Sequence, residues 1–347
     1  MYIKKIVVSI LLLGLIGMAA FSYYVYNAVF IPNTAFNNEE AHIYIPTNAD
    51  FKEVLAELHP LLKDDISFEA VANRKKYPAN IKPGHYVIKK GMNNNDIVNT
   101  IRTNNTPVKV KFNNQERIEN LAGHLSRQIE IDSLAILNAM IAADFLAKND
   151  LNKQNVLSLF IPNTYEVYWN ITAKGFCDKM QKEYNRFWND SRQQKASAIG
   201  MTAGEVISLA AIVQKETAKV DERKRVAGVY INRIKRSMLL QADPTVIYAK
   251  KLTENNFDQE IKRVLYKDLE IDSPYNTYKN IGLPPGPITM PDITSIDAVL
   301  NYENHNYFYF VANVVDFGYH KFAKTFAQHN RNRQEYVRWI NNQGVNR

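Results

Sequence analysis

The stretch Ala203-Gly-Glu-Val-Ile-Ser-Leu-Ala-Ala-Ile-Val-Gln-Lys-Glu-Thr-Ala218 has the clearest helical pattern in the chain. Four of its residues are spaced three, four and three positions apart: Val206, Leu209, Val213 and Glu216. This spacing places them on one face of a helix. The pattern therefore predicts a helix that begins at Thr202 or Ala203, packs through an apolar face, and carries a carboxyl group at the end of that face.

The carboxyl group of Glu216 has two interpretations. If it faces a core or a cleft, it loses hydration and its pKa rises. A carboxyl group with a pKa near neutrality is suited to act as a general acid. In the other interpretation the helix simply ends, and Glu216 has reached solvent. The periodicity alone leaves both open.

Polar and aromatic side chains that suit sugar binding follow this helix. They are Asn232, Arg233, Gln241, Asp243, Tyr275, Asn276 and Tyr278. Structural roles are also open to them. Asp243-Pro244 fits a helix start, with Asp243 as the N-cap and proline at the first helical position. Arg233 could pair with a carboxylate, and the two tyrosines could be packing residues.

The composition is that of an ordinary globular protein. The 347 residues suggest two domains or three small ones, and 46% are apolar and 22% charged. These values exclude a wholly disordered chain, a collagen-like repeat and a polytopic membrane protein. The formal charge of +8 fits a well-solvated surface or attraction to an anionic bilayer or polymer.

The sequence predicts no metal site and no cofactor. A single cysteine, Cys177, excludes an internal disulfide framework and a cysteine-rich zinc site. The seven histidines have no metal-binding spacing, and the chain has no glycine-rich phosphate loop. His320 and His329 fall in a region expected to be a strand followed by a helix.

The N-terminus predicts membrane insertion. Lys4 and Lys5 precede an apolar run from Ile6 to Phe30, which as a helix spans roughly 37 Å. The two lysines predict a cytoplasmic N-terminus and place the rest of the chain outside the cytoplasm. The alternative is a signal peptide cleaved near Ala20. We therefore expect a cytoplasmic stub and anchor over 1–31 and a linker over 32–41. Given export and the modest charge, we expect no nucleic-acid partner.

Residues 42–112 are expected to form a small α/β module. His42–Ile45 and Val108–Phe112 have strand patterns, and Asp96 could cap a helix. The segment Gly84-His-Tyr-Val-Ile-Lys-Lys-Gly91, together with the helix that follows, resembles part of a LysM module, a small glycan-binding fold. A spacer domain without a ligand of its own is the alternative.

Residues 113–347 are expected to form one mixed domain. The part up to residue 200 is predicted to be mostly helical, with Tyr184, Phe187 and Trp188 as core aromatics. Beyond residue 240 the chain becomes rich in loops, and strands are predicted over 307–311 and from residue 320 to 326. The fold class is therefore α+β, with an N-terminal transmembrane helix, a LysM-like module and a mixed helical and β domain.

Several collinear motifs resemble the YceG-like family of endolytic murein transglycosylases. They are Leu209-Ala-Ala-Ile-Val-Gln-Lys-Glu-Thr217, Val229-Tyr-Ile-Asn-Arg233, Leu240-Gln-Ala-Asp-Pro-Thr-Val-Ile-Tyr248, Ser273-Pro-Tyr-Asn-Thr-Tyr278, Gly282-Leu-Pro-Pro-Gly-Pro-Ile288 and Tyr309-Phe-Val-Ala312. Upstream, Phe160-Ile-Pro-Asn-Thr-Tyr-Glu-Val167 is similar to the family's Pro-Asp-Thr-Tyr segment. Asn163, Gln214 and Gln328 stand where the family pattern has acidic residues, which argues against an essential carboxylate at these positions.

The resemblance implies a membrane-anchored lyase that cuts peptidoglycan. Such enzymes cleave the bond between N-acetylmuramic acid and N-acetylglucosamine without water and leave a 1,6-anhydro end. Glu216 then matches the catalytic acid and base, and Thr217 joins the sugar-binding residues above. The expected location is the outer side of the cell membrane. The expected partners are nascent glycan strands and the synthases that polymerise them.

Two other functions remain open at this point. The chain could be a non-catalytic glycan-binding scaffold for peptidoglycan synthases. It could also be a hydrolase, which usually needs a second carboxylate to activate water. The candidates for that carboxylate are Asp221, Glu222 and Asp243.

Overall fold

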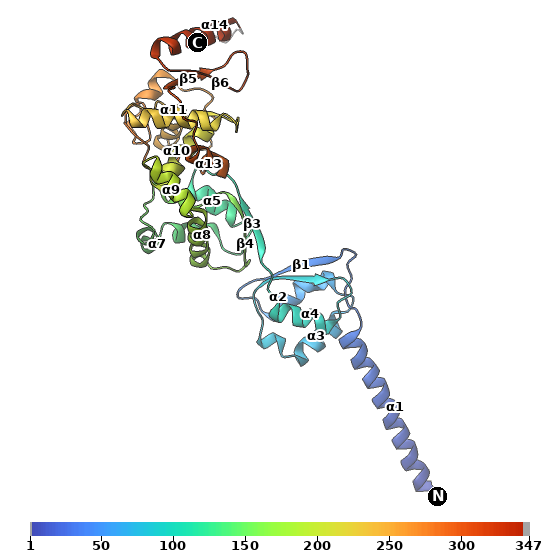
Figure 1. Ribbon diagram of the computed structural model, residues 1–347. Coiled ribbons are helices and arrows are strands. Elements are labelled where there is room, and N and C mark those ends of the chain that lie inside the picture. The colour runs from blue at the N-terminus through green and yellow to red at the C-terminus, as the bar shows by residue number, and fades with distance from the viewer. Residues whose placement is uncertain (1, 343–347) are drawn as a thin grey trace. The chain divides into compact units, whose positions relative to one another are not determined.

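The chain forms two compact units in the computed structural model, which describes residues 2–342 (Figure 1). The N-terminal unit takes the chain up to Val110 together with 127–131 and 165–172. The C-terminal unit takes 111–126, 132–164 and the chain from Ala173 onward. Helices and two-stranded sheets are both present, as the α+β prediction requires.

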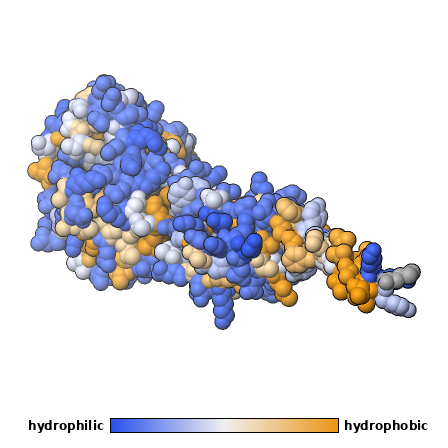
Figure 2. All heavy atoms as spheres, turned by 90° about the horizontal axis from the view of Figure 1, so that it is seen from below, coloured by the Kyte–Doolittle hydropathy of each residue, from blue (hydrophilic) through white to orange (hydrophobic). Residues whose placement is uncertain are grey.

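The first helix, α1 (Tyr2–Phe30), is long and apolar enough to cross a membrane, judged by length and composition. Its apolar side chains are exposed and form an almost continuous apolar surface (Figure 2). This agrees with the predicted anchor, and a signal sequence passes the same test.

The rest of the N-terminal unit packs helices around one antiparallel strand pair. Strand β1 (Glu40–Ile45) pairs with β2 (Gly84–Lys89), with Ile43 opposite Tyr86. Side chains from both strands are buried with the helices in one apolar core. The helices are α2 (Phe51–Leu58), α3 (Asp65–Arg74) and α4 (Asn94–Thr103), with short 3₁₀ turns at His59–Leu61 and Tyr77–Ala79.

Two local expectations in this unit are wrong. Asn93, not Asp96, caps α4: its side chain accepts a hydrogen bond from the backbone N–H of Asp96. The stretch after α1 is not a free linker, because Asn33 and Thr34 are buried and the Asn33 amide donates to Asn94 at 2.7 Å. The packing of the strands and helices fits an α/β module, while the LysM resemblance rests on the sequence segment alone.

Two further sheets have two strands each. One pairs β3 (Val108–Phe112) with β4 (Asn163–Val167), and the other pairs β5 (Tyr309–Ala312) with β6 (His320–Ala323) in antiparallel register. The remaining elements are α5 (Ile118–Leu125), α6 (Ser133–Met140), α7 (Ala143–Lys148), η3 (Val156–Leu159), α8 (Ala173–Phe187), α9 (Asp190–Ala198), α10 (Ala203–Glu216), α11 (Arg223–Lys235), α12 (Asp243–Thr253), η4 (Tyr266–Glu270), α13 (Ile293–Leu300) and α14 (Phe326–Asn342).

The predicted central helix, α10, lies in the core of the C-terminal unit with α11 and α13 beside it (Figure 1). Thr202 begins it with a capping box that includes Glu205, which satisfies two exposed backbone donors. Val206, Leu209 and Val213 are fully buried, as their spacing predicts. Trp188 joins the same core, as expected for that aromatic cluster.

A close backbone approach at Gly286 yields a stability prediction. An added Cβ there would collide with the backbone carbonyl of Gln154, which has little freedom to move. We expect Gly286→Ala to lower the free energy of unfolding by about 1–3 kcal/mol, as overpacking does. Urea denaturation measures it, with Gly204→Ala as the control. Gly204 has open space around it in α10, so alanine should be neutral or slightly stabilising there. Equal stability of both variants would contradict the prediction.

Candidate active site

Glu216 is the last residue of α10, and its carboxyl group is half-buried. The hydroxyl of Tyr230 on α11 donates to Oε1 of Glu216 at 2.6 Å, and the Tyr230 ring is buried. The helix does end at this residue, but the carboxyl group turns to a neighbouring helix instead of open solvent. The apolar face of α10 therefore delivers a carboxyl group to a largely covered position.

The surroundings of Glu216 favour its protonated form. Burial, the largest influence, and the negative charge of Asp243 together raise its pKa to about 7. The Tyr230 hydrogen bond and the positive charges of His320 and Arg233 oppose this shift. A carboxyl group balanced in this way can give up a proton and take one back near neutral pH.

Two predicted site residues of α11, Asn232 and Arg233, use their side-chain N–H groups to bind backbone carbonyls. The guanidinium of Arg233 donates to the carbonyls of Phe308 and Leu240, both at 2.7 Å. The amide of Asn232 donates to the carbonyls of His305 and Tyr307, at 2.7 and 3.0 Å. Arg233 therefore does not depend on a carboxylate partner. Both side chains hold the segment that leads into β5 against α11.

Asp243 differs from its predicted role as a helix cap. The N-cap of α12 is Ala242, and Asp243 is the first helical residue. Its carboxylate accepts a hydrogen bond from the hydroxyl of Tyr278 at 2.6 Å. Asp243 is exposed, and its charge acts on Glu216. The structure thus brings Asp243 and Tyr278 to the neighbourhood of Glu216.

The other predicted site residues divide between buried and exposed positions. Tyr275 is buried against Tyr248, with ring centroids 4.7 Å apart. Asn276 is fully buried and donates to two backbone carbonyls at 2.8 Å. Thr217 is buried at the end of α10 and accepts a hydrogen bond from a backbone N–H. Gln241 is exposed, in a left-handed backbone conformation with φ of 49°.

The structure adds three contacts that could not be predicted from the sequence, made by Tyr230, Glu222 and Asp221. Tyr230 lies three residues before Arg233, and this spacing places both residues on one face of a helix. The spacing is the one feature of the sequence that could have indicated Tyr230 as a site residue. Glu222 is buried and accepts from the backbone N–H and Nδ1 of His320, at 2.7 and 2.8 Å. No spacing rule could connect Glu222 with a residue so distant in the chain. The carboxylate of Asp221 accepts from Tyr319 at 2.9 Å.

The Glu222–His320 pair yields a prediction on stability and pH. Burial disfavours the charge of Glu222, but the hydrogen bonds from His320 prevail and lower its pKa below 4.5. A lowered pKa stabilises the fold above pH 4.5, and this stabilisation is lost as the pH falls through the folded-state pKa. We expect Glu222→Gln to lower the free energy of unfolding at pH 7 by about 1–3 kcal/mol.

Chemical denaturation from pH 7 to pH 3.5 measures this effect. The difference between Glu222→Gln and wild type should shrink in the acid part of that range. Glu119→Gln is the matched control, because Glu119 makes an exposed ion pair with Arg117 and should change stability by less than about 1 kcal/mol. A difference that stays constant with pH would contradict the prediction.

Within residues 2–342 no group of three or more His, Cys, Asp or Glu side chains is placed to hold a metal ion.

A model of the YceG-like family matches residues 43–335. An endolytic murein transglycosylase of Streptococcus pneumoniae serotype 2 is 27% identical over 373 aligned residues, which cover 97% of this chain and 66% of that protein. An endolytic murein transglycosylase of Bacillus subtilis is 41% identical over 133 residues, 38% of this chain and 34% of that protein. The chain thus spans about two thirds of the pneumococcal relative.

The fold is also similar to a solved structure. The crystal structure of a YceG-like protein from Listeria monocytogenes superposes with a TM-score of 0.56 at 28% identity. The match covers 85% of this chain and 99% of that one.

Proposed function

Since the chain belongs to the YceG-like family, we propose that it is a peptidoglycan lytic transglycosylase that cuts glycan strands internally. The names of its pneumococcal and Bacillus relatives support the activity. The observation that carries the proposal is Glu216, a half-buried carboxyl group with a pKa of about 7 at the end of the core helix. One carboxyl group of this kind suffices for the reaction.

In the proposed reaction Glu216 acts twice. Protonated Glu216 donates its proton to the glycosidic oxygen, and the bond from that oxygen to the muramyl anomeric carbon breaks. The C6 hydroxyl of the same sugar attacks the anomeric carbon, and Glu216, now a carboxylate, accepts the hydroxyl proton. The nucleophile, the C6 hydroxyl, belongs to the same sugar as the reacting carbon. The reaction therefore avoids the entropic cost of positioning a separate water molecule. The products are a new 4-hydroxyl end and a 1,6-anhydro-muramyl end.

The neighbours of Glu216 support this division of labour. Tyr230 orients the carboxyl group, and Arg233 and His320 lend positive charge when it becomes a carboxylate. Gln241, Asp243 and Tyr278 are the predicted sugar-binding residues that keep exposed or partly exposed side chains. The hydrogen bonds that Thr217, Asn232, Tyr275 and Asn276 make within the protein favour positioning over direct contact with sugar.

We further propose that α1 holds the enzyme on the outer side of the cell membrane. Its length and apolar composition support anchoring, and Lys4 and Lys5 support a cytoplasmic N-terminus. An anchored enzyme acts on strands close to where they are polymerised, so peptidoglycan synthases are the proposed partners.

A hydrolase is the second candidate, because the charge of Asp243 acts on Glu216. In that mechanism Asp243 activates a water molecule while Glu216 protonates the leaving oxygen. The two candidates differ in the fate of solvent oxygen.

The deciding experiment incubates the full chain in detergent with uncrosslinked glycan strands in water labelled with oxygen-18, followed by mass spectrometry. Internal fragments with unlabelled 1,6-anhydro ends are expected. Reducing ends that carry the label would establish the hydrolase. Binding of strands without cleavage, by protein with native circular dichroism, would favour the scaffold and overturn the proposal.

A further inference from the structure

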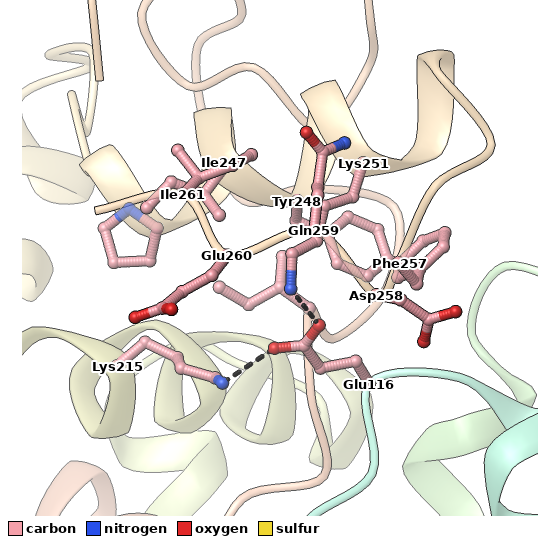
Figure 3. Close-up of a pocket in the computed structure, with 12 residues that line it drawn as sticks. Glu116, Lys215, Ile247, Tyr248, Lys251, Phe257, Asp258, Gln259, Glu260 and Ile261 are labelled. Carbon is pink, nitrogen blue, oxygen red and sulfur yellow. Dashed lines mark hydrogen bonds and ion pairs between the residues drawn. The ribbon is translucent and has the colours of Figure 1, made fainter. Parts of the chain in front are cut away.

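A pocket of about 420 Å³ lies between the end of α10, the helix α12 and the loop that follows α12 (Figure 3). Its walls combine apolar and charged side chains. The lining includes the apolar side chains of Ile247, Tyr248 and Phe257 and the charged groups Glu116, Lys215 and Lys251. The aromatic ring of Phe257 packs against Tyr248, with 5.6 Å between their centroids.

The charged groups form one connected triad. Glu116 accepts a hydrogen bond from Lys215 through one carboxylate oxygen and from Lys251 through the other, both at 2.8 Å (Figure 3). Burial disfavours the charge of Glu116, but the two lysines prevail and lower its pKa. Two lysines against one glutamate leave one net positive charge. An ammonium group has three donors, and the bond to Glu116 uses one of them.

Hydrogen bonds of the two residues before Glu116 fix the position of the triad. The carbonyl of the preceding residue, Gln115, accepts from the backbone N–H of Met290 at 2.8 Å, and the Asn114 amide donates to the Met290 carbonyl at 2.6 Å. The side chain of Lys251 is only 13% exposed. A fixed carboxylate therefore presents two ammonium groups to the pocket with little freedom left to lose on binding.

Two acidic residues of the loop, Asp258 and Glu260, also line the pocket. Asp258 and Glu260 are exposed, and Glu260 lies 3.8 Å from Lys262. Asp258 points away from Glu116 in Figure 3. Solvent and Lys262 screen these charges, whereas the triad is partly buried. The interior of the pocket is thus suited to a ligand with a carboxylate and small apolar groups.

The pocket adjoins the proposed active site along the chain. Lys215 directly precedes Glu216, and Pro244 directly follows Asp243. In peptidoglycan the peptide stem is attached to the same muramyl ring whose anomeric carbon reacts. Two residues of an extended peptide span about 7 Å, which is the reach of the second stem residue from its muramyl ring.

We propose that this pocket binds the acidic peptide stem of the muramyl residue at the cleavage site. Lys215 and Lys251 bind the free carboxylate of its second residue, and Tyr248, Phe257 and Ile247 contact the alanine methyl groups. The inference rests on the proposed function for its substrate, and it assigns the enzyme a preference for strands that still carry stems.

The test compares binding and cleavage. The first probe is N-acetylmuramyl-L-alanyl-D-glutamate, titrated calorimetrically into the full chain in detergent. Its counterpart is the isoglutamine analogue, in which the α-carboxylate is an amide and the γ-carboxylate is kept, so the two probes differ only in the carboxylate that stays free in the stem. We expect the acid to bind at least fivefold more tightly than the amide. Lys251→Gln should abolish this difference, and Lys262→Gln should keep it. Lys262 is a matched control because its side chain is 82% exposed and does not line the pocket.

The second measurement uses glycan strands with and without stems. Lys251→Gln should raise KM for stem-bearing strands about fivefold and leave stripped strands unchanged. Equal loss on both substrates, or equal binding of acid and amide by wild type, would overturn the inference. Absence of 1,6-anhydro products would overturn the proposed function alone, because the calorimetric titration needs no cleavage. Thermal unfolding of each variant identifies a loss caused by misfolding, and Lys251→Arg, which keeps the charge, should then restore the preference.

Discussion

Replacing Glu216 by glutamine is expected to reduce kcat for strand cleavage by at least about 10³-fold. General acid–base catalysis by one side chain contributes roughly 10²–10⁴-fold, and in the proposed reaction the same group performs both proton transfers. Glutamine keeps the size of the side chain and an oxygen that can accept from Tyr230, but it has no proton to give. Release of anhydro-muramyl ends, followed by mass spectrometry, measures the loss.

The stability of Glu216→Gln serves as its control. The pKa of Glu216 is raised from 4.5 to about 7, so the protonated form stabilises the fold below pH 4.5 and this contribution is lost as the pH rises through 7. Glutamine does not ionise, so at pH 8 the variant should be more stable than wild type by roughly 1–3 kcal/mol. At pH 4, below the unfolded-state pKa, the two should be nearly equal. A variant that is folded and keeps a tenth of the wild-type activity would remove Glu216 from the mechanism.

The central helix and its carboxyl group could be predicted because both depend on local spacing. The period of Val206, Leu209 and Val213 is set by packing of α10 against its neighbours, and Glu216 continues that face. Whether the carboxyl group was covered could not be predicted. The cover comes from Tyr230, on a different helix, and periodicity in one helix says nothing about the side chain that a second helix places opposite it.

The roles of the polar residues were harder to predict, because their partners are backbone atoms distant in sequence. Asn232 and Arg233 have the composition of a sugar-binding pair, yet their donors bind carbonyls of residues 305–308 and 239–240. A carbonyl is present at every position, so no motif marks the ones that are used. The prediction that Asp243 caps α12 was wrong for a related reason. The local Asp-Pro pattern favours a helix cap, but the carboxylate of Asp243 accepts a hydrogen bond from the distant hydroxyl of Tyr278.

In the N-terminal unit the strands were predicted well and the caps and connections less well. Alternation in 42–45 predicted β1, and the strand over 108–112 is also present. The polar stretch after α1 resembled a linker because polar residues usually remain in solvent. Asn33 is buried because its amide and carbonyl groups bond to Asn94 and to the backbone of Asp64, which satisfies them inside the unit.

The pH dependence of cleavage should have a single alkaline limb near pH 7. In the proposed reaction Glu216 must be protonated at the start, and its pKa is about 7. The value of kcat/KM should therefore be level below that pH and fall about tenfold for each unit above it. Initial rates from pH 4.5 to 9 measure the profile, and a level profile through pH 7 would contradict the prediction.

Tyr230→Phe should move this limb in a defined direction. The Tyr230 hydrogen bond lowers the pKa of Glu216, so its removal raises that pKa and shifts the limb to higher pH. The ratio of activity at pH 8 to activity at pH 6 should increase, even if activity at pH 6 falls because the carboxyl group is less well oriented. Tyr319→Phe is the matched control, since its hydroxyl binds Asp221 and not Glu216. If the limb of Tyr230→Phe stays in place or moves to lower pH, the ionisation of Glu216 does not set the limb. Misfolding cannot imitate the expected result, because a general loss of structure lowers the rate without moving the limb to higher pH.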